Sequence, residues 1–281
     1  MSSTDPSTRA HRPRIAVWHI IALLLIILFI VFPFYWMVTS SFKDTQDILS
    51  PTPKFLFQPT LENYQKALSK FDVVASLENS LIVALASTAL SLILGAPAAY
   101  ALARFEFKGK RDLWFWFITN RMVSPIVLAL PFFLLARNLR ILDTQLALIL
   151  IYLTFNIPII VWICSDQFRS IPKELDEAAM LEGYGAFRIF WKIAIPLGAP
   201  GLAVSAIFSF IFSWNELLYA LVLTREHART APVVATSFMS GYELPWGQIM
   251  ATGTLIVLPV IIFSMIVSRQ LVQGLTMGAV K

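Results

Sequence analysis

The chain has 281 residues, of which 57% are hydrophobic and 14% charged, and its mean hydropathy is +0.71. Soluble domains carry about a quarter of charged residues, so this composition excludes an ordinary soluble domain. The net charge of +5 fits basic residues gathered on one side of a membrane and indicates no nucleic-acid partner. An all-α, polytopic protein embedded in membrane lipid is therefore predicted.

Six apolar blocks are long enough to cross a bilayer as helices. They follow an N-terminal arm, residues 1–14. The first block is longer than the apolar core of a signal peptide, and Phe32–Trp36 stands where a small-residue cleavage site would be needed, so we expect a retained anchor. The predicted spans are Ile15–Val38, Ser80–Leu102, Trp114–Ala136, Thr144–Ser165, Gly201–Leu223 and Gln248–Val267.

Basic residues predict the orientation of these spans. Arg9, Arg12 and Arg14 precede the first one, which favours a cytoplasmic N-terminus. An even number of spans then returns the C-terminus, residues 268–281, to the same side. The segment 39–79 is predicted to be an external, ordered excursion that contains a short helix.

Common motifs for nucleotide binding, metal binding and catalysis are missing from the sequence. No G-x-x-x-x-G-K-[ST] loop occurs, so this chain is not expected to bind ATP by itself. Its histidines, His11, His19 and His227, have no metal-ligand spacing, and no catalytic motif is present. We therefore predict no catalytic residue, no metal and no cofactor in this chain.

Two charged residues fall at membrane depth, which is costly unless they face a cavity or a partner. Arg121 follows Asn120, and Glu216 follows Trp214 and Asn215. An aromatic face beside amide, carboxylate and guanidinium groups suits a polyhydroxylated solute, so these residues are the candidate substrate path. Two alternatives stay open, in which the charges reach the membrane interface or pair with a neighbouring subunit.

Between the fourth and fifth predicted spans lies a short polar segment, residues 170–196, on the predicted cytoplasmic side. Ser170 can cap a helix, and Glu174 and Asp176 would favour the positive end of its dipole in the first turn. Gly183 and Gly185 can end it, since glycine readily adopts the left-handed conformation. A second helix is then expected from Ala186 to Ala194, ending at Pro196. Small side chains and one exposed carboxylate on this helix–turn–helix favour the close approach of another protein, although an ordinary surface loop explains the same residues.

Here the chain resembles the permease subunits of ATP-binding-cassette importers, whose inner loop has the pattern E-A-A, three residues, G, nine residues, I, one residue, L-P. Ile195 replaces the usual leucine. The Trp214–Glu216 motif and the C-terminal Gln273–Lys281 resemble the carbohydrate-uptake branch, and within it the second, six-span permease of the maltose type. The positions that match the inner-loop pattern are Glu177, Ala178, Ala179, Gly183, Ile193 and Pro196.

The resemblance implies the fold of a type I importer permease over residues 15–281. It also implies a bacterial plasma-membrane location and several partners: a second homologous permease, two ATPase subunits that bind ATP and Mg²⁺, and an extracytoplasmic solute-binding protein. Residues 177–183 would form the coupling helix that docks on the ATPase, and the tail from Gly274 would reach towards the ATPase pair. The segment 224–246 would face the binding protein, and the substrate would be a carbohydrate.

Other functions remain as alternatives. The solute could be a polyol, a modified sugar or a non-sugar such as phosphate, an amino acid or a metal complex. An ion-coupled secondary carrier is expected to show two related halves with interrupted helices, and the sequence has no such symmetry. A purely structural anchor has no use for a glycine-punctuated inner loop.

Overall fold

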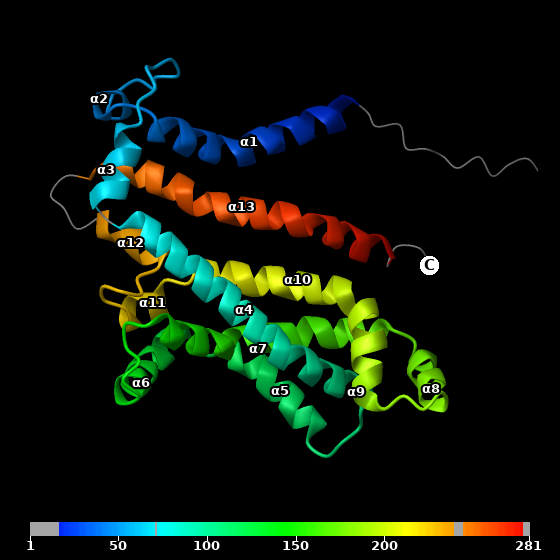
Figure 1. Ribbon diagram of the computed structural model, residues 1–281. Coiled ribbons are helices and arrows are strands. Elements are labelled where there is room, and N and C mark those ends of the chain that lie inside the picture. Colours follow the sequence, from blue (N-terminus) through cyan, green and yellow to red (C-terminus); the bar gives the residue numbers. More distant parts are fainter. Residues whose placement is uncertain (1–16, 71, 239–243, 278–281) are drawn as a thin grey trace, which may run out of the picture.

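The computed structural model describes residues 17–70, 72–238 and 244–277, and every regular element within these ranges is helical (Figure 1). The arm 1–14 and residues 278–281 of the tail lie outside the described residues. The elements are α1 Val17–Ser41, α2 Thr45–Ile48, α3 Glu62–Lys70, α4 Val73–Arg104, α5 Lys110–Asn120, α6 Pro125–Asn138, α7 Gln145–Ser170, α8 Lys173–Leu181, α9 Ala186–Ile189, the π-helical η1 Phe190–Ala194, α10 Ile195–Trp214, α11 Leu218–Leu223, α12 Ala231–Ser237 and α13 Trp246–Met277.

Among the described helices, five candidate spans are long and apolar enough to cross a membrane, and a sixth results if α5 and α6 form one broken span. The predicted all-α polytopic fold is thus confirmed. The helices α4, α7 and α10 pack on one another, α13 packs on α10, and α1 packs on α13 at the edge (Figure 1). One end of this bundle carries α8, and the other carries α2, α3, α11 and α12; we call them the α8 end and the loop end.

The third predicted span, Trp114–Ala136, is not one continuous helix. It consists of α5 and α6, which meet at an angle of 97°. Proline at position 125 disfavours a helical conformation of Ser124, and it suits the first turn of α6 because that turn needs no N–H donor.

The fifth predicted span, Gly201–Leu223, is likewise interrupted. The helix α10 ends at Trp214, and Asn215 and Glu216 precede a separate short helix, α11. On its N-terminal side, in contrast, helical structure continues unbroken from Ala186 through η1 into α10. The continuous helical stretch that contains this candidate span therefore begins earlier in the chain than predicted.

Small residues let α4 approach its neighbours closely. Ser87, Ser91, Gly95 and Ala99 recur every fourth residue and are all buried, which is the pattern that brings membrane helices together. A Cβ at Gly95 would lie 2.8 Å from Cγ2 of Ile160 on α7. The fold therefore depends on the absence of a side chain at this crossing.

The three core helices also share a buried polar contact. Ser213 Oγ of α10 accepts hydrogen bonds from Ser87 Oγ of α4 at 3.1 Å and from Asn156 Nδ2 of α7 at 2.8 Å. Such interhelical bonds stabilise membrane bundles because lipid offers polar groups no alternative partner.

A second close approach joins α10 to α7, and from it we predict the effect of a substitution on stability. A Cβ at Gly198 would lie 2.5 Å from Cε1 of the buried Phe168. We expect Gly198→Val to destabilise the protein by about 1–3 kcal/mol through overpacking. Thermal unfolding of the detergent-solubilised protein measures this, and Ala199→Val, at the neighbouring exposed position, is the control. Equal unfolding temperatures for the two variants would contradict the packing.

The predicted ordered excursion at 39–79 is confirmed by α2, α3 and the start of α4. Asn63 of α3 donates hydrogen bonds through Nδ2 to the carbonyl oxygens of Ser41 at 3.0 Å and Lys43 at 2.7 Å. The Lys43 ammonium lies 4.1 Å from the ring centroid of Trp36, a favourable cation–π contact. These contacts join α3 to the end of α1 and so hold the excursion in place at the loop end.

The carboxylate of Asp143 organises the segment after α11. Its oxygens accept hydrogen bonds from the backbone N–H groups of Arg225 at 2.9 Å, Glu226 at 3.1 Å, His227 at 3.1 Å and Ala228 at 3.2 Å. Burial acts to raise the pKa of Asp143, but these donors outweigh it and lower the pKa from 3.8 to about 2. The carboxylate's stabilising contribution is therefore complete above the ordinary value and is lost as the pH falls towards about 2.

Replacing this carboxylate tests its role. We expect Asp143→Asn to loosen residues 225–228 because the amide nitrogen would face N–H donors, at a cost of about 1.5–3 kcal/mol. Limited trypsin cleavage at Arg225 and Arg229 in the purified protein should then become faster. The control is Glu106→Gln, which removes an exposed carboxylate at the α8 end. Unchanged cleavage at Arg225 would refute the anchoring role.

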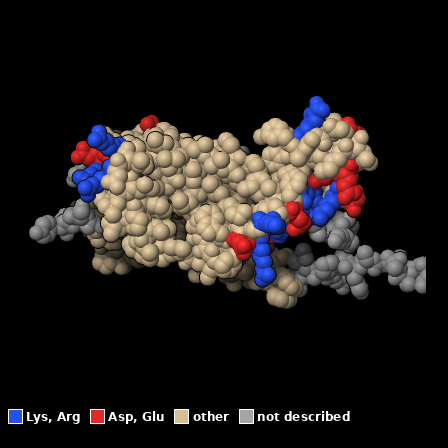
Figure 2. Space-filling view, turned by 90° about the horizontal axis from the view of Figure 1, so that it is seen from below, with Lys and Arg blue, Asp and Glu red and all other residues tan. Residues whose placement is uncertain are grey.

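Charge is distributed as a membrane protein requires. Figure 2 shows that the visible face is largely free of charged side chains between two ends where basic and acidic residues gather. The apolar belt matches the bilayer core, where exposed charges are costly.

Candidate functional site

The short polar segment predicted from the sequence forms α8, a turn and α9 at one end of the bundle (Figure 1). Glu174 and Asp176 lie in the first turn of α8, as predicted, where carboxylates favour the positive end of the helix dipole. Gly183 has a φ of +84°, the predicted left-handed conformation that ends the helix. Gly185 is extended instead, with φ −76° and ψ 162°, and precedes α9.

Two details of this segment differ from prediction. Ser170 does not cap α8: it is the last residue of α7, its Oγ donates to the Gln167 carbonyl at 2.7 Å, and Pro172 takes the capping position. Pro196 does not end the second helix. The π-helical turn η1, closed by a bond from Ile195 N to the Phe190 carbonyl, changes the hydrogen-bond register just before the proline, and the helix continues as α10.

The side chains of α8 divide into an inner and an outer face. Asp176 and Ala179 are buried, whereas Glu177 and Ala178 are exposed. Leu181, at the end of the helix, is 91% exposed, and Met180 beside it is 52% exposed. This projecting surface of small, apolar and acidic side chains is typical of a contact with another protein.

The inner face is held by a buried ion pair. Arg104 Nε, at the end of α4, lies 2.9 Å from Asp176 Oδ2, and the two side chains are 5% and 8% exposed. Tyr100 donates a hydrogen bond from its hydroxyl to the same oxygen at 3.3 Å. Ala179 packs in the same cluster as Tyr100 and Phe168, so α8 rests on the ends of α4 and α7.

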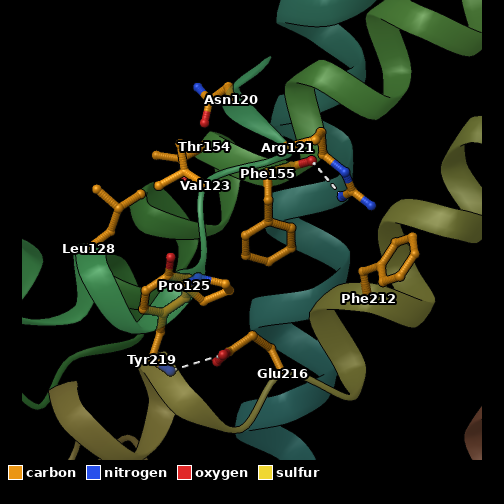
Figure 3. Close-up of a pocket in the computed structure, with 10 residues that line it drawn as sticks. All are labelled: Asn120, Arg121, Val123, Pro125, Leu128, Thr154, Phe155, Phe212, Glu216 and Tyr219. Atoms are coloured by element: carbon orange, nitrogen blue, oxygen red, sulfur yellow. Dashed lines mark hydrogen bonds between the residues drawn. The ribbon is translucent and has the colours of Figure 1, made fainter. Parts of the chain in front are cut away.

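A cavity of about 260 Å³ lies where the two broken spans meet α7 (Figure 3). Irregular backbone at membrane depth is tolerated where it lines a cavity or is covered by protein. Both helix breaks contribute here, the first at residues 121–124 and the second at residues 215–217. The lining residues are Asn120, Arg121, Val123, Pro125, Leu128, Thr154, Phe155, Phe212, Glu216 and Tyr219.

Glu216 lies just before α11 at the edge of this cavity. Its Oε1 accepts from Tyr219 N at 2.9 Å, and its Oε2 accepts from Ala220 N at 3.1 Å and from the Tyr152 hydroxyl at 2.9 Å. The carboxylate thus satisfies the free N–H groups of a helix terminus, which stabilises both the helix and the charge. Glu216 is therefore a capping residue whatever else it contacts.

Arg121 lies at the other side of the cavity, with the ring of Phe155 between the two charges (Figure 3). Its guanidinium donates to the Phe155 carbonyl at 3.2 Å and lies 4.9 Å from the Phe212 ring centroid. The Arg121 side chain is exposed, and none of the ion pairs among the described residues includes it. Its remaining N–H groups can therefore donate to a ligand.

The structure brings together Asn120, Arg121 and Glu216 but not the other two predicted substrate-path residues. Trp214 is 1% exposed, stacks on Phe210 and donates from Nε1 to the Ile256 carbonyl of α13 at 3.2 Å. Asn215 donates to the Ile211 carbonyl at 2.9 Å and does not line the cavity.

Sequence reasoning missed the aromatic wall of the cavity. Phe155 and Tyr219 stack at 6.4 Å between ring centroids, and Thr154 adds a hydroxyl group. Within a long apolar span these residues look like any lipid-facing aromatic. Phe155 lies on the continuous helix α7 and Tyr219 on α11, so their meeting beside Arg121 and Glu216 is a tertiary contact.

The fold and these two features define the class: a multi-span helical membrane protein with an exposed surface helix at one end and a cavity between two broken spans. Residues 91–277 match the family described as "Binding-protein-dependent transport system inner membrane component". The chain belongs to this family and is a multi-pass permease subunit, not an enzyme, of a binding-protein-dependent ATP-binding-cassette importer.

Relatives cover nearly the whole chain. It is 39% identical over 265 residues to the trehalose transport system permease protein SugB of Mycobacterium tuberculosis, covering 92% of this chain and 94% of the relative. It is 35% identical over 266 residues to the trehalose/maltose transport system permease protein MalG of Thermococcus litoralis, covering 93% and 95%. A solved bacterial transporter that imports the acidic polysaccharide alginate shares the fold, with a TM-score of 0.75, 23% identity and coverage of 96% and 99%.

Proposed function

We propose that this chain is the second permease subunit of a carbohydrate importer, and that α8 couples it to an ATPase. The observation that carries the proposal is the combination of an α8 that projects Leu181 and Glu177 into solvent with a polar and aromatic cavity between two helix breaks. The docking element and the solute path then lie in the same chain.

The coupling role is supported by how α8 is built. Glu177, Ala178 and Gly183 are exposed, Ala179 is buried against the bundle, Ile193 is half-buried and Pro196 is exposed at the start of α10. The exposed small residues let a partner approach closely, and the buried ones transmit its position to the bundle. In this proposal α8 and both termini are cytoplasmic.

The substrate class is supported by the cavity and by the relatives. The faces of Phe155 and Tyr219 suit the C–H surfaces of a pyranose ring, and Asn120, Arg121 and Glu216 offer hydrogen-bonding groups for hydroxyls. Several relatives are named for trehalose, maltose or diacetylchitobiose transport. A companion permease would complete the solute path, and a binding protein would deliver the sugar to the loop end.

Uptake by the reconstituted complex tests this proposal. Proteoliposomes would contain this chain, the companion permease and the ATPase, with the binding protein and labelled trehalose, maltose or diacetylchitobiose added outside. We expect ATP-dependent accumulation of at least one saccharide, with labelled phosphate and an amino acid excluded. Accumulation of a non-sugar alone would overturn the substrate class, and uptake without the ATPase would favour a secondary carrier.

The glycine after α8 gives a matched prediction for the coupling segment. A side chain is sterically free at both Gly183 and Gly185, but only Gly183 has a positive φ. Gly183→Val should therefore strain the turn by about 1–3 kcal/mol and reduce binding-protein-stimulated ATP hydrolysis, whereas Gly185→Val should retain it. ATPase rates of the two reconstituted variants measure the difference. Equal stimulation in both would contradict a role of this turn in coupling.

A further inference from the structure

The helix α4 is joined by polar contacts at both of its ends to the two parts of the chain that would meet partners. With 32 residues at about 1.5 Å each it is about 48 Å long, enough to run from the loop end to the α8 end. At one end stand Asn79 and Ser80, and at the other Tyr100 and Arg104. All four side chains are buried or nearly so.

At the α8 end the joint is the Arg104–Asp176 ion pair, with the Tyr100 hydroxyl as a third member. Within α8 the buried residues are Asp176 and Ala179, so this helix has little apolar surface to hold it in place. The pair also suits both helix dipoles, because the cation ends α4 and the carboxylate lies in the first turn of α8. The orientation of α8 on α4 therefore depends largely on this contact.

At the loop end the joint is made by backbone groups of the segment that follows α11. Asn79 Nδ2 donates to the carbonyl oxygens of His227 at 2.9 Å and Arg229 at 3.0 Å. Ser80 Oγ accepts from Ala231 N at 2.8 Å. The same segment is held on its other side by Asp143, so a displacement of the loop must move the end of α4.

We propose that α4 transmits displacement between the 225–231 loop and α8, with Arg104, Asp176 and Asn79 as positioning residues. This inference rests on the proposed function, which sets the loop against the binding protein and α8 against the ATPase. Its step is mechanical: the two joints make loop, helix and α8 move together, so binding at one end biases the conformation at the other.

The first test removes the joint at the α8 end without leaving a buried charge unpaired. Arg104→Met with Asp176→Leu replaces the pair by apolar side chains, a change that membrane and soluble folds tolerate when both charges go together. In the full reconstituted complex we expect normal assembly and basal ATP hydrolysis, but a maximal binding-protein-stimulated rate lower by at least about fivefold. The binding-protein concentration for half-maximal stimulation should not change. Full stimulation in this variant overturns the proposal.

Two further variants keep the test decisive. Tyr100→Phe removes only the hydroxyl bonded to Asp176, so it serves if the double variant does not assemble, and an unchanged stimulated rate would then count against the joint. The control is Asp166→Asn with Arg169→Gln, which removes an exposed ion pair at the same end and should leave stimulation unchanged.

The second test asks whether the two joints act through one element. Asn79→Leu removes the bonds to the loop, together with the bond that Gln145 Nε2 of α7 donates to Asn79 Oδ1, and we expect it to reduce stimulation as the α8-end variant does. Combining the Asn79 variant with the α8-end variant should not lower the stimulated rate further, because either variant alone already interrupts transmission along α4. Multiplicative losses would show two independent effects and refute the role of α4. If Leu181→Asp on the outer face of α8 leaves ATPase binding intact, the proposed function fails; if it abolishes binding while the joint variants behave as wild type, only this inference fails.

Discussion

Replacing Leu181 by aspartate is expected to abolish binding of the ATPase subunit. Leu181 is 91% exposed and ends the helix that is proposed to dock on the ATPase. Burying an unpaired carboxylate where an apolar side chain belongs costs several kcal/mol, and an anchor residue at the centre of an interface contributes about 2 kcal/mol or more. Affinity should therefore fall at least about thirtyfold.

Co-purification of the ATPase with the membrane-embedded permease pair measures this loss. The matched control is Leu56→Asp, since Leu56 is 94% exposed but lies at the loop end. It should retain the ATPase. Loss of the ATPase in both variants would point to a general defect of the complex, and retention in both would remove α8 from the interface.

The second large effect is expected at Glu216. Substitution by alanine leaves Tyr219 N, Ala220 N and the Tyr152 hydroxyl without their acceptor, at about 1–3 kcal/mol for each buried group. We expect α11 to lose its N-terminal anchor, the cavity to change shape, and uptake to be nearly abolished. Uptake of labelled saccharide and thermal stability of the solubilised protein are the measurements.

The glutamine variant separates capping from contact with the solute. Glu216→Gln keeps one acceptor oxygen and should retain most of the stability, so a reduced uptake affinity would then indicate contact with the sugar. Full uptake in this variant would refute a contact between Glu216 and the sugar but would leave the capping role intact. Asn215→Ala is the control, because the Asn215 side chain donates to the Ile211 carbonyl of α10 and does not line the cavity.

The two kinds of site differ in how much local sequence could predict. The segment proposed to couple to the ATPase is specified locally: Gly183 has a left-handed conformation, and Glu174 and Asp176 belong in a first helical turn. Those features were predicted. The burial of Asp176 was not predicted, because its partner Arg104 lies on a different helix and no local rule brings them together.

For the predicted substrate path, the local sequence could identify charges that are costly to bury but not the contacts that lower this cost. Arg121 and Glu216 stood out because charges are expensive at membrane depth. What lowers that cost is tertiary: Glu216 caps a helix that exists because α10 ends at Trp214, and Arg121 reaches a carbonyl of α7. Trp214, two residues before Glu216 in the sequence, instead contacts α13.

By itself, the sequence determined the class of the protein, its apolar spans and the position of the polar inner loop, because bilayer thickness, hydropathy and glycine conformation act residue by residue. Only the tertiary structure decided that two spans are broken, that a cavity lies between the breaks, and that α4 is joined at both ends to other segments. Helix breaks at membrane depth survive where neighbouring elements satisfy the freed backbone groups. Buried ion pairs likewise need both partners in place, so neither can be derived from one stretch of chain.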